Sequence, residues 1–173
     1  PYDDLAEMAG RIVAAAEATG IGLTLLPVHY QYGGMDRRPL GAGQARFGTD
    51  PALYLRLLAE SAARLRGLPD ADLGAAPHSL RAVSADGLRE VLAAGVGPVH
   101  MHLAETVAEV EEVRAATGAR PVEWLLGEAG VDQGWCLVHC TQMEPGETLA
   151  LAATGAGAGL CPLTEALLGD GIF

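Results

Sequence analysis

The chain has 173 residues, half of them hydrophobic and 19% charged, with a formal net charge of -11. This composition predicts a folded domain, or part of one, and excludes disorder as a description of the whole chain. The balance of 11 basic to 22 acidic residues disfavours nucleic acid and membrane surfaces as partners. No run approaches the roughly 18 apolar residues of a spanning helix, so we expect a cytoplasmic protein.

Two features of the composition exclude particular mechanisms. All 11 basic residues are arginine, so a Schiff-base lysine, a phosphate-binding GK[ST] loop and a carbamylated lysine between two metals are all excluded. The three cysteines contain no CxxC pair, which favours a reducing compartment. We expect Cys136 and Cys140 to be buried, unreactive thiols rather than metal ligands.

Helical patterns and short apolar runs alternate along the chain. Helices are predicted over residues 3–19, 50–65, 84–94, 106–117, 121–129 and 144–154. Apolar runs fall at 21–30, 73–78, 96–103, 135–140 and 156–161. Five such runs separated by helices predict an α/β fold with parallel strands and helical crossovers. The glycine-rich stretch 155–159 precedes a strand and lacks the GxGxxG spacing, so it predicts a close turn rather than a nucleotide site.

All five histidines lie at or near the carboxyl ends of the apolar runs, where an α/β barrel carries its active site. They are His29, His78, His100, His102 and His139. Any single one is adequately explained as a core or loop histidine. Several on successive strands favour a shared site.

His102 is the candidate metal ligand. His100 and His102 are two residues apart on a strand, so both face the barrel interior, and Glu105 follows closely enough to act on a metal-activated water. For Glu105 the alternative is a carboxylate that stabilises a helix N-terminus. His100 is expected to be a packing or supporting residue.

Two further strand ends contribute candidate residues. His139 closes the next strand, beside His102, and is suited to orient water or polarise a substrate group. His78 ends the preceding strand, and Arg81 after it can hold a carboxylate with two hydrogen bonds. The alternative for Arg81 is an exposed loop residue.

Three groups of residues have ordinary structural explanations. These are Glu109, Glu111 and Glu112 on a solvated helix face, Trp124 and Trp135 in the core, and Arg37 and Arg38 in an exposed loop.

Several short sequence motifs together resemble those of the formimidoylglutamate deiminases of the amidohydrolase superfamily. These are APHSLRAV (76–83), PVHMHLAE (98–105), RPVEWLL (120–126), WCLVHCT (135–141), GLCP (159–162), and TEA with LGDGIF (164–173). The loop from Gly33 to Phe47 is similar to that family too. The resemblance runs through nearly the whole chain in order.

The resemblance implies a (β/α)₈ barrel with one zinc that hydrolyses N-formimino-L-glutamate to N-formyl-L-glutamate and ammonia. It implies His102 as the metal ligand on the fifth strand, with Glu105 as general acid and base and His139 as the second catalytic residue. His78 and Arg81 match the substrate-binding group, with Arg81 on a glutamate carboxylate. The family also implies a homodimer of the complete enzyme, and the missing lysine agrees with a single metal.

The family's first-strand His-x-His pair and eighth-strand Asp have no counterpart in these residues. We therefore expect residues 1–173 to hold about strands 3 to 7 of the barrel, as an internal, partial hydrolase domain that is inactive alone, because such barrels need roughly 250 residues. Thr106 stands where the family usually has Gln, and Leu167 where it usually has Asn. The alternatives are a related deaminase of a nucleobase or aminated heterocycle, and a non-catalytic α/β binding domain.

Overall fold

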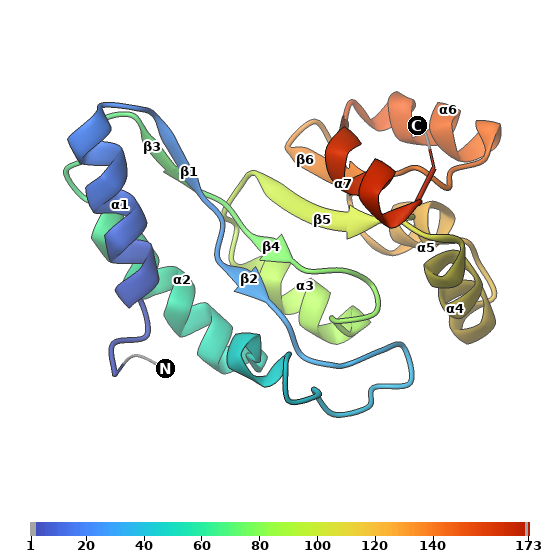
Figure 1. Ribbon diagram of the computed structural model, residues 1–173, viewed down its shortest axis with the longest axis horizontal. Coiled ribbons are helices and arrows are strands. Elements are labelled where there is room, and N and C mark those ends of the chain that lie inside the picture. Colours follow the sequence, from blue (N-terminus) through green and yellow to red (C-terminus); the bar gives the residue numbers. More distant parts are fainter. Residues whose placement is uncertain (1–2, 172) are drawn as a thin grey trace.

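The computed structural model describes residues 3–171 and 173, in which parallel strands alternate with helices (Figure 1). In chain order the elements are α1 (Glu7–Thr19), β1 (Leu23–Leu25), β2 (Val28–His29), the 3₁₀ helix η1 (Ala45–Phe47), α2 (Pro51–Leu65), β3 (Ala71–Leu73), β4 (Ala76–Pro77), α3 (Ala85–Ala93), β5 (Val99–Leu103), α4 (Val107–Thr117), α5 (Pro121–Glu128), β6 (Trp135–His139), α6 (Pro145–Thr154), β7 (Gly157–Gly159) and α7 (Pro162–Leu168). The predicted α/β class is confirmed.

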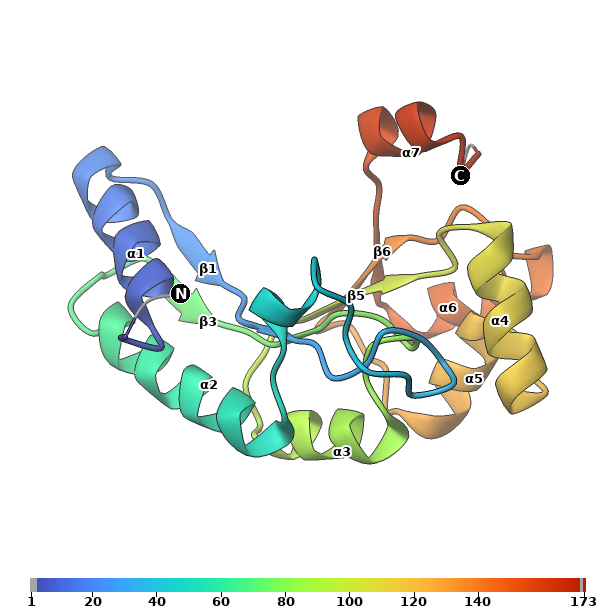
Figure 2. The same cartoon turned by 60° about the horizontal axis from the view of Figure 1, so that its bottom comes forward.

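Every strand pairing among the described residues is parallel. β1 pairs with β3, β2 with β4, and β5 with β6, which pairs with β7. Single bridges from Ala75 to Val99 and from Ser79 to His102 connect β4 to β5. Figure 2 shows α2, α3 and α5 along one side of the strands and α7 on the other side. All the strand ends that carry candidate residues therefore face the same way.

Two of the predicted strands are each divided into two short ones. Pro27 interrupts the first run because proline has no backbone N–H to donate, and its carbonyl accepts from Ala76 N and from the Tyr54 hydroxyl. Gly74 interrupts the second run. A side chain there would lie 2.2 Å from the carbonyl oxygen of Pro98, so only glycine permits this close approach to the next strand.

Side chains cap three of the predicted helices at their expected first residues. Asp50 accepts a hydrogen bond from Leu53 N, Ser84 from Gly87 N and Thr106 from Glu109 N, which satisfies backbone donors that a helix leaves free. The glycine-rich turn is confirmed as well, because Gly155 ends α6 in the left-handed conformation (φ 78°) before β7 begins.

Helix α7 was not predicted. The sequence did carry its signals, since Pro162 occupies the first helical turn and Gly169 ends the helix with a φ of 74°. The apolar run 156–161, which predicts a strand, ends directly before this helix.

The main core lies between β5, β6 and the helices on one side of them. Val99, Met101 and Leu103 on β5 are buried, whereas the alternating His100 and His102 are partly exposed. Trp135 is in the core as predicted, and Cys140 is 1% exposed. Burial raises the pKa of the Cys140 thiol to about 12, which confirms an unreactive thiol, while Cys136 is only half-buried. Among the described residues, no helix is long and apolar enough to cross a membrane.

Candidate functional site

Four aromatic rings from four strand ends form a continuous row. Tyr30 contacts His78 with ring centroids 4.4 Å apart, His78 contacts His102 at 4.8 Å, and His102 stacks on His139 at 5.5 Å. Three of the predicted site residues thus lie side by side, although they are up to 61 positions apart in the sequence. The parallel pairing brings the ends of β5 and β6 together on one edge of the sheet, where Leu103 pairs with His139 and His102 with Val138.

The hydrogen bonding of His102 leaves one ring nitrogen free. Its Nδ1 lies 2.9 Å from the carbonyl oxygen of His78, and because a carbonyl only accepts, Nδ1 carries the proton. Nε2 then keeps its lone pair and has no hydrogen-bond partner among the described residues. A metal-binding histidine in proteins characteristically donates its other N–H to a carbonyl in this way. The residue therefore fits a zinc ligand.

Glu105 and His139 face one another next to His102. His139 Nε2 is 3.4 Å from Glu105 Oε1, and their side chains are 5% and 17% exposed. The carboxylate is thus near an imidazole in a site from which bulk water is mostly excluded, where a proton can move between polar groups. Glu105 does not act as a helix cap, because Thr106 has that role.

Burial keeps His78 neutral. Desolvation, with smaller contributions from His102 and Arg81, lowers the pKa of His78 to about 4. Its Nδ1 lies 3.1 Å from the Ser79 hydroxyl. A neutral His78 can donate one hydrogen bond and accept another at the row of rings.

The prediction that Glu109 lies on a solvated helix face was wrong, because its side chain is fully buried. Its carboxylate accepts hydrogen bonds from Ala104 N at 3.1 Å and Glu105 N at 2.9 Å. Burial is the largest influence on the pKa of Glu109 and raises it. Ala104 has a φ of 49°, so this carboxylate holds the unusual turn that carries Glu105. The spacing Thr-x-x-Glu was the signal in the sequence.

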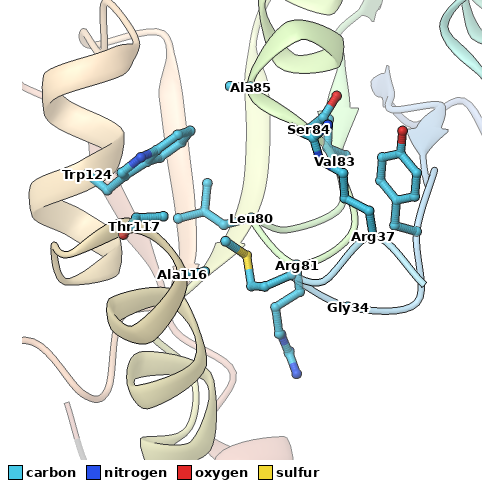
Figure 3. A pocket seen from close by; sticks show the side chains of 12 residues that line it. Gly34, Arg37, Leu80, Arg81, Val83, Ser84, Ala85, Ala116, Thr117 and Trp124 are labelled. Carbon is cyan, nitrogen blue, oxygen red and sulfur yellow. The ribbon is translucent and has the colours of Figure 1, made fainter.

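Arg81 lies near the row of rings without an ion-pair partner among the described residues. Its Nε is buried and has no hydrogen-bond partner. It also lines a pocket of about 180 Å³, where Figure 3 shows Trp124 and Thr117 on one side and Arg37 and Ser84 on the other. None of the row residues lines that pocket. Arg81 therefore has an unused hydrogen-bond donor and lies in the wall of this pocket.

Two histidines lie outside the row. His29 is fully buried against the Tyr54 ring at 4.8 Å, and its Nδ1 lies 2.8 Å from the Thr49 hydroxyl. Burial lowers the pKa of His29 to about 4. His100 lies on the same face of β5 as His102, one layer from the strand end. His29 therefore has the core role that was the alternative for each single histidine, and the role of His100 as a packing or supporting residue stays a prediction.

Sequence reasoning missed two contacts of the row, Tyr30 and Glu165. Glu165 on α7 is 5% exposed, and its Oε1 lies 3.1 Å from His139 Nδ1. Ligand atoms of His139, Cys161 and Glu165 lie within 4.8 Å of one another, which makes them a group that could hold a metal. Glu165 belongs to the motif TEA, but no pattern in the sequence connected it to a residue 26 positions earlier.

Comparison with known proteins agrees with the resemblance in the sequence. The chain is 49% identical to formimidoylglutamate deiminase of Pseudomonas aeruginosa over 99% of its own length. This chain is a relative of formimidoylglutamate deiminase. It spans 38% of the length of that relative. No family model matches the chain.

Solved structures extend the comparison to the fold. An amidohydrolase from Brucella melitensis is 51% identical, with a TM-score of 0.95 over all of this chain and 39% of its own. An adenosine deaminase from Xanthomonas campestris with bound zinc superposes with a TM-score of 0.79 over 95% of this chain and 36% of its own, at 23% identity. The second likeness concerns the fold alone.

Proposed function

We propose that this chain is the central part of a zinc-dependent deiminase that hydrolyses N-formimino-L-glutamate to N-formyl-L-glutamate and ammonia. The observation that carries the proposal is the row His78, His102 and His139 with Glu105 beside it, in a chain 49% identical to formimidoylglutamate deiminase. The five strand positions then correspond to about strands 3 to 7 of a (β/α)₈ barrel. The first-strand His-x-His pair and the eighth-strand Asp would lie outside residues 1–173.

His102 would hold the metal through Nε2, because its Nδ1 proton is donated to the His78 carbonyl. When bound, zinc supplies a Lewis acid that polarises the formimino carbon and lowers the pKa of water to about 7. The remaining chemistry belongs to side chains of this chain.

Glu105 would transfer the proton. Its carboxylate accepts a proton as the water oxygen bonds to the formimino carbon, and returns it to the terminal =NH nitrogen. It then moves the remaining hydroxyl proton of the tetrahedral adduct to the same nitrogen, so that the C–N bond breaks, the formyl C=O forms and ammonia leaves. His139, 3.4 Å from that carboxylate, would orient the water and stabilise the tetrahedral adduct that forms at the reacting carbon. The buried surroundings of both groups strengthen these interactions.

Arg81 and His78 would bind the substrate. The unpartnered Nε of Arg81 is a buried donor, and a glutamate carboxylate supplies the acceptor it lacks. Neutral His78 would donate a hydrogen bond without adding charge. Arg81 supplies the local positive charge that an anionic substrate needs in a chain of formal net charge -11. We further propose a cytoplasmic enzyme and, for the complete chain, a homodimer.

The test is ammonia release from formiminoglutamate by the complete enzyme, with methylthioadenosine, guanine and cytosine as competing substrates. We expect turnover of formiminoglutamate only, because Arg81 selects a carboxylate. Preferential turnover of a heterocycle would instead establish the alternative deaminase, and the absence of any turnover by the metal-loaded enzyme would favour a binding domain. The 173-residue chain alone is expected neither to bind zinc tightly nor to turn over substrate.

Arg81→Ala sharpens the test of the substrate. Loss of a charged hydrogen-bond donor costs about 1.5 to 3 kcal/mol, so we expect KM for formiminoglutamate to rise roughly 10- to 100-fold. Arg37→Ala is the matched control, since Arg37 lines the same pocket but lies on the Ser84 side of it (Figure 3). An unchanged KM for Arg81→Ala would show that Arg81 does not bind the substrate carboxylate.

A further inference from the structure

Glu165 reaches the candidate site from α7, the helix that follows β7. It lies in α7, is 5% exposed, and its Oε1 is 3.1 Å from His139 Nδ1. The same oxygen accepts a hydrogen bond from Cys161 N at 2.7 Å. A buried carboxylate with two defined donors is fixed in position.

The imidazole of His139 thus lies between two carboxylates. Nδ1 faces Glu165 at 3.1 Å and Nε2 faces Glu105 at 3.4 Å. The backbone hydrogen bond from Cys161 is the largest influence on the pKa of Glu165 and lowers it, so this carboxylate is ionised at neutral pH. An ionised carboxylate only accepts, hence Nδ1 must carry a proton.

We infer that Glu165 is a positioning residue for His139, which holds the proton on Nδ1 and directs Nε2 toward Glu105 and the reacting carbon. The catalytic consequence rests on the proposed function, whereas the geometry does not. With Nδ1 fixed as the donor to Glu165, the ring orientation is set and Nε2 is the atom presented to Glu105 and the reacting carbon. A carboxylate that orients a catalytic histidine in this manner acts through the histidine and does not touch the substrate.

The backbone explains why His139 needs such a partner. His139 and Cys140 have φ values of 76° and 55°, a left-handed conformation that costs non-glycine residues about 1 to 3 kcal/mol each. Such a conformation persists only where the surroundings hold it, and it turns the end of β6 away from regular strand geometry. The Glu165 contact supplies one such constraint on the ring.

The hydrogen bonds also argue against a metal ion in the group of His139, Cys161 and Glu165. Oε1 of Glu165 already accepts from His139 Nδ1 and from the Cys161 amide. A cation at this oxygen would have to displace the Nδ1 proton and would face the positive end of the amide dipole. The arrangement fits a hydrogen-bonded pair better than a second metal site.

The kinetic test compares Glu165→Met with Glu165→Gln in the complete zinc-loaded enzyme. Methionine fills similar space without a strong acceptor, and we expect kcat to fall roughly 10- to 100-fold, as for the outer partners of metal-site histidines, with KM nearly unchanged. Glutamine keeps a carbonyl oxygen that can accept from Nδ1, so it should restore much of the loss. Thermal unfolding of each variant reports the structural cost.

Glu147→Met is the matched control. Glu147 is also a buried carboxylate near a helix N-terminus, where it accepts from Arg120 Nε and Glu144 N, but it does not contact His139. We expect it to lower the unfolding temperature without a comparable loss of kcat. A Glu165→Met enzyme with kcat within about threefold of wild type, or equal losses of kcat in both Met variants, would overturn the inference.

A measurement without substrate separates this inference from the proposed function. In the ¹⁵N spectrum of histidine-labelled wild-type enzyme, His139 is expected to carry a proton on Nδ1 at neutral pH, and its signal is assigned by its absence in His139→Gln. An Nδ1 without a proton, whether free or bound to metal, overturns the inference. If no ammonia is released from formiminoglutamate, the proposed function fails while this result still decides the role of Glu165.

Discussion

The carboxyl ends of β2 and β6 carry the same residue in similar burial but in opposite chemical surroundings. His29 is 0% exposed and His139 is 4% exposed. The ring of His29 meets a hydroxyl and a phenol, whereas the ring of His139 meets a carboxylate at each nitrogen. Burial alone therefore does not identify a functional histidine. What distinguishes His139 is a carboxylate within 3.4 Å of each ring nitrogen, and charged partners of this kind are typical of proton-transfer sites.

Replacing each histidine by glutamine is expected to give the largest difference between the two strand ends. We expect His139→Gln to lower kcat of the complete enzyme by about 10² to 10⁴, the usual contribution of general acid–base groups. His29→Gln should change kcat less than threefold and lower the unfolding temperature instead, because the ring of His29 packs against Thr49 and Tyr54 and lies outside the row of rings. Steady-state kinetics and thermal unfolding of both variants measure this. Equal kinetic losses would mean that the two strand ends do not differ in function.

The pH dependence of stability should sharpen the comparison. The pKa of His29 falls from 6.5 to about 4 on folding, chiefly through desolvation, so the unfolded chain binds the proton more tightly. The stability contributed by neutral His29 is present above pH 6.5 and is lost as the pH falls toward 4, by up to about 3 kcal/mol. Urea unfolding across this range gives the slope.

The His29→Gln variant is the control for that slope, since it removes the titrating group and can still hydrogen-bond Thr49. Its free energy of unfolding should decline less between pH 6.5 and 4 than that of the wild type. Identical slopes for the two proteins would show that His29 is not held neutral.

The smallest expected effect is on stability, and it concerns Tyr54, whose ring packs against His29. The Tyr54 hydroxyl donates to the Pro27 carbonyl at 2.9 Å and accepts from Ala76 N at 3.3 Å, and burial raises the pKa of Tyr54 to about 12. Tyr54→Phe should cost about 1 to 2 kcal/mol of unfolding free energy, with kcat unchanged. Leu55→Ala on the exposed side of α2 serves as the control, with an expected cost below about 0.5 kcal/mol. If Tyr54→Phe left the free energy of unfolding unchanged, these hydrogen bonds would not stabilise β2 and β4.

Local sequence patterns predicted most elements of the fold. Asp50, Ser84 and Thr106 cap their helices through their own side chains, and capping depends on residues only three positions away. The divided strands were not predicted, because the close approach of Gly74 to Pro98 involves a neighbouring strand. Glu109 was assigned to the wrong environment for a related reason. A helix face is solvated or buried according to what packs on it, and here the turn before α4 folds over the carboxylate.

The sequence by itself determined the parallel α/β class, the resemblance to the deiminases, and the set His78, His102, Glu105 and His139 at strand ends. It could do so because strand period and helix caps are local, and because parallel strands end on one edge. Only the tertiary structure separated His29 from His139 and brought Glu165 to the ring of His139. Those assignments depend on the partners that reach each nitrogen across 20 and 26 positions of chain, and long-range packing decides which partners these are.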